Sequence, residues 1–408
     1  MTRVVPIALA AAVATLLAAC GGTGQGKPRK QLLVVVNAPF SRTPYLGQAI
    51  ENGVRLAASE VDAGGVRVGG TTYDLKVQTM DSALSPARAV ANVRRAVSEH
   101  AIAIVDEGTG LDASWRSARG TAICVVFQGG KKLVDPTARP DVFRIAPTDH
   151  GIAFRLAEYV VPKGLKVALV HDDSGYGSAG GSELHDAFAQ NRSSVAVEET
   201  VPADALDLAP QILRARRAGA TAIVVWGQPP TIAAAIAAAR SAGWDVPVFA
   251  PPAGADPFVR QQLADHPSWV DGLTFAGGRL TAEVGSGPFK TFERKVESAF
   301  GVDRVGVETA AGAEVIQPPE TAMYAYDFVN LLAAAIVKAG STDPSKIPAA
   351  LEEVTVEGAN GDERSFNQVS HEGVVDDDVY FARFRDMTYA PVRDDPLSAT
   401  LPRIPQTR

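Results

Sequence analysis

The sequence predicts an α/β protein of two lobes, each built on a doubly wound parallel sheet. From Gln31 onward, short β-branched runs alternate with longer alanine-rich segments of helical period. Alternation of this kind is typical of a parallel sheet that is covered by helices. The alternation ends near Pro147 and then starts again, which indicates a second sheet. The chain of 408 residues is long enough to give each lobe its own core.

Apolar runs predict the strands and helices of the first lobe. Leu32–Val36 is a continuous apolar run, the pattern of a strand in a sheet that is covered on both faces. Over Tyr45–Val61 the apolar residues recur mostly every four positions, which gives one apolar stripe on a helix that Gly64-Gly65 ends. The same unit recurs as strands at Tyr73–Thr79, Ala101–Val105 and Ala122–Phe127, with helices at Pro86–Ser98 and from about Leu111, and the alternation restarts after Val142–Pro147.

The second alternation predicts the other lobe. Its strands are expected at Lys166–His171, Val195–Thr200, Ala222–Trp226 and Val246–Ala250. Its helices are expected near Gly151–Val161, Ser182–Asn191, Leu208–Ala218 and Thr231–Ala242. The remainder of the chain adds strands at Leu273–Ala276 and Val379–Arg383 and helices at Pro288–Phe300, Ala322–Ala339 and Ser345–Val354.

The amino terminus has the composition of a secretory signal segment. An uncharged apolar run, Val4–Ala19, follows Arg3 and ends at Cys20. A run of this length, interrupted by Pro6, is short for a membrane span, which needs about 20 residues. We therefore expect residues 1–19 to be a signal peptide.

The end of this segment carries a lipidation signal. Leu17-Ala18-Ala19-Cys20 resembles the bacterial lipobox, in which the cysteine thiol receives a diacylglyceryl group. Residues 20–30, rich in glycine after Cys20, would then form a lipidated tether that holds the protein at a membrane outside the cytoplasm. A secreted protein that is cleaved at an ordinary signal site is the alternative.

Composition and motifs exclude several classes of function. The formal charge of −7 gives no general electrostatic reason to bind nucleic acid. The sequence contains neither the G-x-S-x-G motif of serine hydrolases nor the H-E-x-x-H motif of zinc proteases. We therefore expect that the protein is not an enzyme and that it binds no metal ion or cofactor. Cys124 lies in an apolar run and is expected to be a buried free thiol.

The loop after the third strand is the first candidate for a binding site, because open parallel sheets bind ligands beyond the carboxyl ends of their strands. It reads Asp106-Glu107-Gly108-Thr109-Gly110, and its glycines let a ligand approach the backbone where amides favour an anion. Its G-x-G-x-x-A spacing also matches a dinucleotide fingerprint, but that motif belongs after the first strand. A tight turn without a ligand stays open as an alternative.

Two further loops follow predicted strands. Gln128-Gly129-Gly130 comes after the fourth strand, and its consecutive glycines can present unobstructed amides to the same anionic group. In the second lobe, Tyr176 stands between two glycines. We expect this tyrosine on a flexible loop, where its ring can close over a small molecule.

Four motifs occur in a characteristic order along the chain: the helix segment Gly47–Ala57 with the turn at Gly64-Gly65, then Ser85–Ala89, Val142–Asp149 and Asp172–Gly177. This ordered set resembles one known family, the branched-chain amino acid-type solute-binding proteins of ABC transporters, which have the periplasmic binding protein type I fold. The resemblance extends from Gln31 to about Val392.

The resemblance implies two lobes that are joined by a three-crossing hinge and close on a solute in the cleft between them. The first lobe would hold residues 31–147 and 278–354, the second lobe residues 148–277 and 355–395, and residues 396–408 would form a C-terminal tail.

The resemblance also implies a set of ligand contacts. The ligand carboxylate would be fixed by the loops after the third and fourth strands, and Tyr176 would be the closing aromatic residue. The full expected set is Tyr45, Glu107, Gly108, Thr109, Gln128, Gly129, Gly130, Tyr176, Trp226 and Gln228.

The chain departs from the family at the loop after Phe249. Amino acid binders usually place an acid there to pair with the ligand ammonium, whereas this chain has Ala250-Pro251-Pro252-Ala253. Two explanations stay open. Asp106 or Glu107 of the other lobe replaces the missing acid, or the solute has no amino group.

The function that the resemblance implies is that of an extracytoplasmic solute-binding lipoprotein. It would capture a small carboxylate-bearing solute, an amino acid or a related acid or amide, and deliver it as a monomer to an ABC permease. The alternative is a receptor module of the same fold that signals to a partner instead of supplying a transporter.

Overall fold

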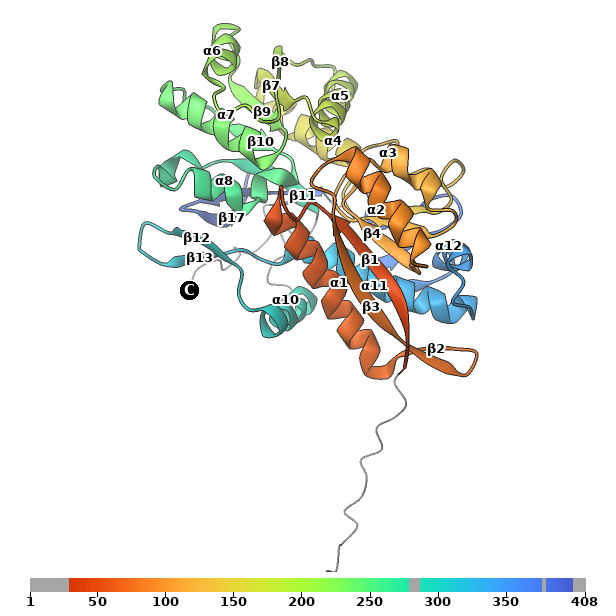
Figure 1. Ribbon diagram of the computed structural model, residues 1–408. Coiled ribbons are helices and arrows are strands. Elements are labelled where there is room, and N and C mark those ends of the chain that lie inside the picture. The colour runs from red at the N-terminus through yellow and green to blue at the C-terminus, as the bar shows by residue number, and fades with distance from the viewer. Residues whose placement is uncertain (1–28, 279–286, 376–378, 399–408) are drawn as a thin grey trace, which may run out of the picture.

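Two lobes lie side by side in the computed structural model, which describes residues 29–278, 287–375 and 379–398 (Figure 1). The first lobe contains a six-stranded sheet in the order β2-β3-β1-β4-β5-β6, parallel except for β2. Its strands are β1 (Lys30–Ala38), β2 (Val66–Val68), β3 (Thr71–Asp81), β4 (Ala103–Asp106), β5 (Ala122–Val125) and β6 (Val142–Arg144).

The second lobe contains a seven-stranded sheet in the order β17-β16-β11-β10-β9-β7-β8. The strands from β8 to β11 in this order are parallel, and β16 and β17 add an antiparallel edge. The strands are β7 (Val167–Asp172), β8 (Val197–Val201), β9 (Ala222–Trp226), β10 (Val248–Ala250), β11 (Thr274–Gly278), β16 (Val379–Arg385) and β17 (Thr388–Pro391). The predicted α/β fold of two parallel-sheet lobes is confirmed.

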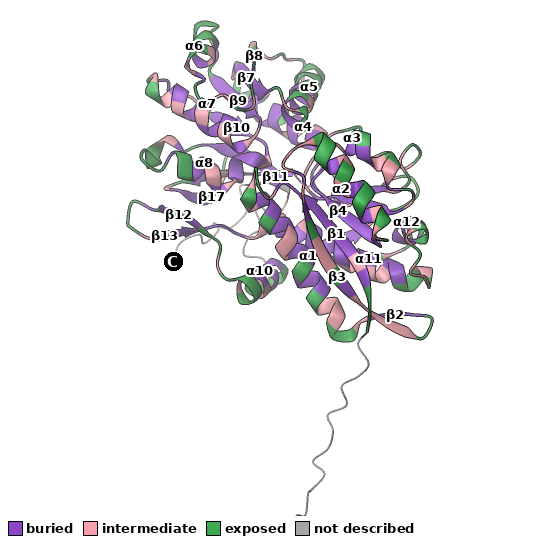
Figure 2. Cartoon of the chain, in the orientation of Figure 1, coloured by how far each residue is buried: buried purple, intermediate pink, exposed green. Residues whose placement is uncertain are grey.

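Helices cover the sheets, so that the central strands are buried (Figure 2). The first lobe has α1 (Pro44–Gly64), α2 (Pro86–Ser98), α3 (Leu111–Ser114), α10 (Gly287–Phe300), α11 (Glu320–Ala339) and α12 (Ile347–Leu351). The second lobe has α4 (Asp149–Val160), α5 (Gly175–Gln190), α6 (Ala209–Arg217), α7 (Pro229–Ser241) and α8 (Pro257–Gln262). Short 3₁₀ helices lie at Trp115–Ser117, Val161–Lys163, Pro252–Ala255, Pro267–Trp269 and Pro344–Lys346.

The chain passes between the two lobes three times. It leaves the first lobe after β6, returns after β11 to helices α10 and α11, which pack on α1, and enters the second sheet again at β16. Two small hairpins accompany these passages: β12 (Arg304–Glu308) with β13 (Glu314–Ile316), and β14 (Thr355–Glu357) with β15 (Glu363–Ser365).

Each of these hairpins contacts a different lobe from the one to which the predicted boundaries assign it. The β14–β15 hairpin is joined to α11 of the first lobe, and Glu372 pairs with Arg144 at the end of β6. The contacts of residues 355–375 are therefore with the first lobe, although the predicted boundary assigns them to the second. The β12–β13 hairpin instead reaches the second lobe, where the side-chain amide of Gln261 on α8 donates to the Val305 carbonyl at 2.7 Å.

α11 is a core helix. Among the described residues it is long and apolar enough to cross a membrane by length and composition, but 61% of its most apolar window is buried inside the protein. It packs along α1, where Gly53 gives the room: a Cβ there would lie 2.0 Å from the Ala322 carbonyl oxygen. The close contact between these two helices therefore requires a glycine.

An ion pair inside the first lobe ties the β14–β15 hairpin to α11. Arg364 Nε donates to Asp327 Oδ2 at 2.9 Å, and the Ala359 amide donates to Asp327 Oδ1 at 2.7 Å. Both charged side chains are almost completely buried, and burial raises the pKa of Asp327 to about 6. Removal of one partner would leave the other charge buried without compensation.

We therefore expect Asp327→Ala to lower the free energy of unfolding by about 3–5 kcal/mol. Lys338→Ala is the control, because Lys338 pairs with Glu353 on the exposed surface of the same lobe, and exposed pairs contribute about 0–1 kcal/mol. Urea unfolding followed by circular dichroism measures both changes. Equal losses in the two variants would contradict the importance of the buried pair.

Candidate functional site

A cleft opens between the lobes at the carboxyl ends of both parallel sheets. Its volume is about 730 Å³. We call it the outer cleft; it is lined from the first lobe by Arg42, Thr109 and Gln128 and from the second by Ser174, Tyr176 and Gln228, among others. Four of the residues predicted from the sequence, Thr109, Gln128, Tyr176 and Gln228, thus come together around one space.

Hydrogen bonds connect the two first-lobe loops of the outer cleft. Gln128 Nε2 donates to Glu107 Oε1 at 2.9 Å and to Thr109 Oγ1 at 3.0 Å. Glu107 also accepts from the Thr109 amide at 3.2 Å, and it is buried. Its carboxylate therefore holds the loop in shape from behind, while Thr109 and Gln128 line the cleft.

Gly108 is required by the same arrangement. Its φ of +119° is rarely adopted by residues with a side chain, and a Cβ would lie 2.6 Å from the Cβ of Gln128. The glycine therefore allows the two loops to approach each other closely.

Gly129 and Gly130 lie behind the outer cleft and do not line it. The Gly129 carbonyl accepts from the Asp149 amide at 2.8 Å, and the Gly130 carbonyl accepts from Arg144 Nη1 at 2.9 Å. Arg144 is itself buried and forms a bidentate ion pair with Glu372. In this structure these glycines position the loop that carries Gln128.

The prediction that Tyr176 lies on a flexible loop is wrong. Tyr176 is in the first turn of α5, which begins seven residues before the predicted helix. Ser174 caps this helix, because its hydroxyl accepts from the Gly177 amide at 3.0 Å. The cap satisfies an amide at the helix start, and the flanking glycines are accommodated within the helix.

Tyr176 belongs to a row of three aromatic rings that crosses the interface between the lobes. Its ring centroid lies 6.2 Å from that of Phe127 in the first lobe and 6.3 Å from that of Trp226. Trp226 is fully buried beneath Gly180, where a Cβ would lie 2.0 Å from the indole. Trp226 therefore supports Tyr176 from behind and lines neither the outer cleft nor the inner cavity described next.

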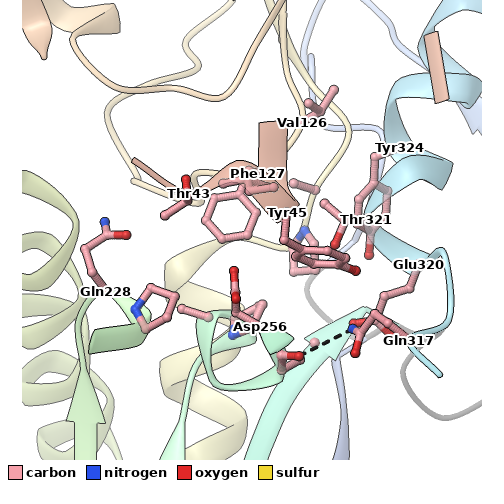
Figure 3. Close-up of a pocket in the computed structure, with 18 residues that line it drawn as sticks. Thr43, Tyr45, Val126, Phe127, Gln228, Asp256, Gln317, Glu320, Thr321 and Tyr324 are labelled. Atoms are coloured by element: carbon pink, nitrogen blue, oxygen red, sulfur yellow. Dashed lines mark hydrogen bonds between the residues drawn. The ribbon is translucent and has the colours of Figure 1, made fainter. Parts of the chain in front are cut away.

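A second space of about 50 Å³, the inner cavity, lies between the lobes next to the chain crossings (Figure 3). It is lined from the first lobe by Tyr45, Phe127 and Glu320 and from the second by Gln228, Pro252 and Asp256, among others. Gln228 and Thr43 line both spaces. Tyr45, predicted as a ligand contact, thus lies at the inner cavity.

Asp256 is a residue of the site that sequence reasoning missed. It follows the proline-rich loop after β10 and caps α8, since its Oδ1 accepts from the Phe258 amide at 2.8 Å. Burial raises the pKa of Asp256 to about 6, against an opposing effect of Arg260. The loop at Ala250–Ala253 lacks an acid, but the same segment supplies one to the inner cavity three residues later.

The comparison with known families decides the classification. Residues 34–388 match the family model described as "Periplasmic binding protein". The chain belongs to the periplasmic binding protein family. No sequence among the curated proteins matches it.

Solved structures share the type I fold of this periplasmic binding protein. A type 1 periplasmic binding protein from Bordetella pertussis Tohama I superposes with a TM-score of 0.75 at 21% identity, over 87% of this chain and 97% of that chain. A branched-chain amino acid transporter substrate-binding protein from Streptococcus pneumoniae, in complex with isoleucine, gives 0.73 at 18% identity over 88% and 98%. A solute-binding protein from Rhodopseudomonas palustris, in complex with benzoate, gives 0.71 at 17% identity over 89% and 95%.

Two histidines of the periplasmic binding protein lie within hydrogen-bonding distance of glutamate side chains near the site. His171 Nε2 lies 3.0 Å from Glu198 Oε1, and His150 Nδ1 lies 3.1 Å from Glu183 Oε2. Within residues 29–278, 287–375 and 379–398, no group of three or more His, Cys, Asp and Glu side chains could hold a metal ion.

Buried carboxyls lie at the strand ends that border the site. Burial raises the pKa of Asp106 to about 7, although hydrogen bonds from Asn37 Nδ2 at 2.7 Å and from the Gly108 amide at 2.7 Å favour the ionised form. Burial likewise raises the pKa of Asp149 to about 7. The binding protein thus keeps protonatable carboxyls in the walls behind its cleft.

The raised pKa of Asp106 predicts a pH dependence of stability. An aspartate in the unfolded chain titrates at about 3.9, so between about pH 4 and pH 7 the folded state binds the additional proton. The stabilisation is complete below about pH 4 and is lost as the pH rises through 7.

We expect Asp106→Asn to flatten the fall in unfolding free energy between about pH 4 and pH 7. Chemical unfolding at a series of pH values measures the slope. Asp204→Asn, at an exposed aspartate of the outer cleft, is the control and should keep the slope of the unchanged protein. Parallel curves for all three proteins would show that Asp106 does not titrate in this range.

Proposed function

We propose that this periplasmic binding protein captures a small carboxylate-bearing solute, an amino acid or a related acid or amide, and delivers it to an ABC permease. The observation that carries the proposal is the outer cleft, whose walls come from both lobes and from the loops at the carboxyl ends of both sheets. A solute held there contacts both lobes at once.

The first-lobe loops provide polar groups for a carboxylate. Thr109 lines the cleft and carries a hydroxyl group, which can donate a hydrogen bond as well as accept one. The solved relatives that bind isoleucine and benzoate support this chemistry, because both ligands carry a carboxylate.

Five of the ten residues predicted as ligand contacts line the two spaces between the lobes. Thr109, Gln128, Tyr176 and Gln228 line the outer cleft, and Tyr45 lines the inner cavity. We propose direct solute contact for these five. Glu107, Gly108, Gly129, Gly130 and Trp226 support them from behind.

Closure of the lobes is the proposed mechanism. A solute that contacts both lobes stabilises the closed state more than the open state and shifts the population toward it. The permease then recognises the closed surface. The lobes are connected by three chain segments, so a rotation about these segments can open the cleft without unfolding either sheet.

We also propose a cellular location for the protein. Cys20 and the tether at 20–30 lie largely outside the described residues, whose first strand begins at Lys30. We propose that Cys20 carries the lipid that keeps a monomeric protein at the outer face of the cytoplasmic membrane or elsewhere in the cell envelope. Family membership agrees with an extracytoplasmic location.

Solute binding should compact the protein. A thermal-shift screen of amino acids, aromatic acids, amides and polyols identifies a solute, and small-angle scattering then measures the radius of gyration with and without it. A smaller radius is expected because the lobes close. A solute that raises the melting temperature without any compaction would contradict closure.

The same solute should bind more weakly to variants of the outer cleft. We expect Thr109→Ala and Tyr176→Phe each to lower the affinity by about tenfold in calorimetry, since each removes one polar contact. Thr137→Ala, outside the two spaces that form the site, should bind normally. Unchanged affinity in both cleft variants would remove the site assignment and leave the fold intact.

Lipid attachment at Cys20 can be tested by fractionation. We expect Cys20→Ala to abolish acylation and to release the protein from the membrane fraction, because several acyl chains account for stable anchoring. Cys124→Ala is the control, since Cys124 is buried in β5 and cannot be acylated in the folded protein. Membrane retention of Cys20→Ala would contradict the proposal.

A further inference from the structure

A pocket on the second lobe carries an excess of positive charge. Its volume is about 430 Å³, and it is lined by Arg383, Arg385, Ala390, Pro391, Arg393 and Asp394. We call it the edge pocket, because it lies on β16 and on β17, the edge strand of the second sheet (Figure 1). Three guanidinium groups thus share this pocket with a single carboxylate, in a chain whose formal charge is −7.

The edge pocket lies at the end of the sheet opposite the outer cleft. The register pairs Arg383 with Thr274, the first residue of β11, so Arg383 stands at the amino end of the parallel strands. The outer cleft lies at their carboxyl ends. No described residue that lines the edge pocket also lines the outer cleft or the inner cavity. An occupant of the edge pocket is therefore distinct from the solute of the proposed function.

The turn after β17 brings Arg393 to the edge pocket. Asp395 fixes this turn, because its carboxylate accepts from Arg155 Nη2 on α4 at 2.9 Å and from the Ser398 hydroxyl at 2.7 Å. The Ser398 oxygen in turn accepts from the Phe381 amide of β16 at 2.9 Å. The segment that carries Arg393 is thus tied both to α4 and to the strand that carries the other two arginines.

Arg383 and Arg385 keep hydrogen-bond donors for a ligand. They are two residues apart on β16, so their side chains leave the same face of the sheet. Arg383 donates from Nη2 to the Tyr159 hydroxyl at 3.2 Å and to Asp394 Oδ1 at 3.4 Å, and its Nη1 bonds to no described residue. The exposed side chain of Arg385 forms no hydrogen bond or ion pair with a described residue.

The single carboxylate of the edge pocket is shared with other groups. Asp394 Oδ2 accepts from the Tyr159 hydroxyl at 2.7 Å and lies 3.4 Å from Lys163 Nζ. Asp394 therefore already faces Lys163 and Arg383, and it does not also neutralise Arg385.

A neighbouring pocket shows the contrast. It has a volume of about 420 Å³ and shares two residues with the edge pocket. Its charges balance, because three cations face three acids: Lys163, Arg240 and Arg383 with Asp245, Asp271 and Asp394. The uncompensated positive charge is therefore concentrated in the edge pocket.

We propose that the edge pocket binds a phosphate-bearing anion, held between the guanidinium groups of Arg383, Arg385 and Arg393. Like charges in one pocket repel each other, and an anion between them replaces this repulsion by attraction. A guanidinium group can donate two parallel hydrogen bonds to a phosphate, whose oxygens serve more than one arginine at once. A single carboxylate offers only two oxygens to the same three groups. Soluble phosphate esters and the headgroup of an anionic phospholipid share this chemistry.

Three soluble probes test the class of ligand: inorganic phosphate, acetate and monomeric dihexanoyl phosphatidylglycerol. Calorimetry with the purified protein measures their affinities. We expect phosphate or the lipid probe to bind at least about tenfold more tightly than acetate. Tighter binding of phosphate would identify a soluble phosphate compound as the ligand, and tighter binding of the lipid probe would identify a headgroup. Acetate binding as tight as both, or no binding of either phosphate probe, would overturn the inference.

Variants localise the anion. Arg385→Gln removes one guanidinium group without breaking a described contact, and it should lower the affinity of the bound probe by about tenfold. Arg385→Lys keeps the charge but not the planar fork, so it should retain part of the affinity. Arg67→Gln is the matched control, because it removes the same charge from an exposed position on β2 of the first lobe.

Unchanged affinity in Arg385→Gln, or an equal loss in Arg67→Gln, would overturn the assignment to the edge pocket. Arg385→Gln should bind the solute of the outer cleft as the unchanged protein does, since the two spaces share no described residue. Failure of the edge-pocket proposal would therefore leave the proposed function standing.

Discussion

A buried aspartate at the carboxyl end of a strand organises the cleft wall in each lobe. Asp106 ends β4 and accepts from the Gly108 amide and from Asn37. Asp172 ends β7 and accepts from the Ser174 amide at 3.2 Å and from the Gln228 amide at 2.7 Å. Because the strands are apolar on both faces, these strand ends are where polar groups can be placed without loss of core packing. The loops that border the solute depend on them.

The sequence predicts the central strands and long helices well because their patterns are local. The predicted residues of α2 and β9 coincide with those of the structure, since a proline start or a continuous apolar run marks each element. The hairpins β12–β13 and β14–β15 escaped prediction. Their strands have three to five residues and several exposed side chains, so they give no apolar run, and contacts with the lobes stabilise them instead.

The site could be predicted where its residues directly follow a strand. Thr109, Gln128 and Gln228 do so, and the parallel order of the strands brings their loops together. The glycines on either side of Tyr176 predict a loop, because glycine is typical of interruptions in helices, but α5 begins at the Ser174 cap and includes both glycines. Asp256 carried a local signal, an aspartate before a proline that begins a helix, which indicates a cap and does not reveal that the lobe interface lies beside it.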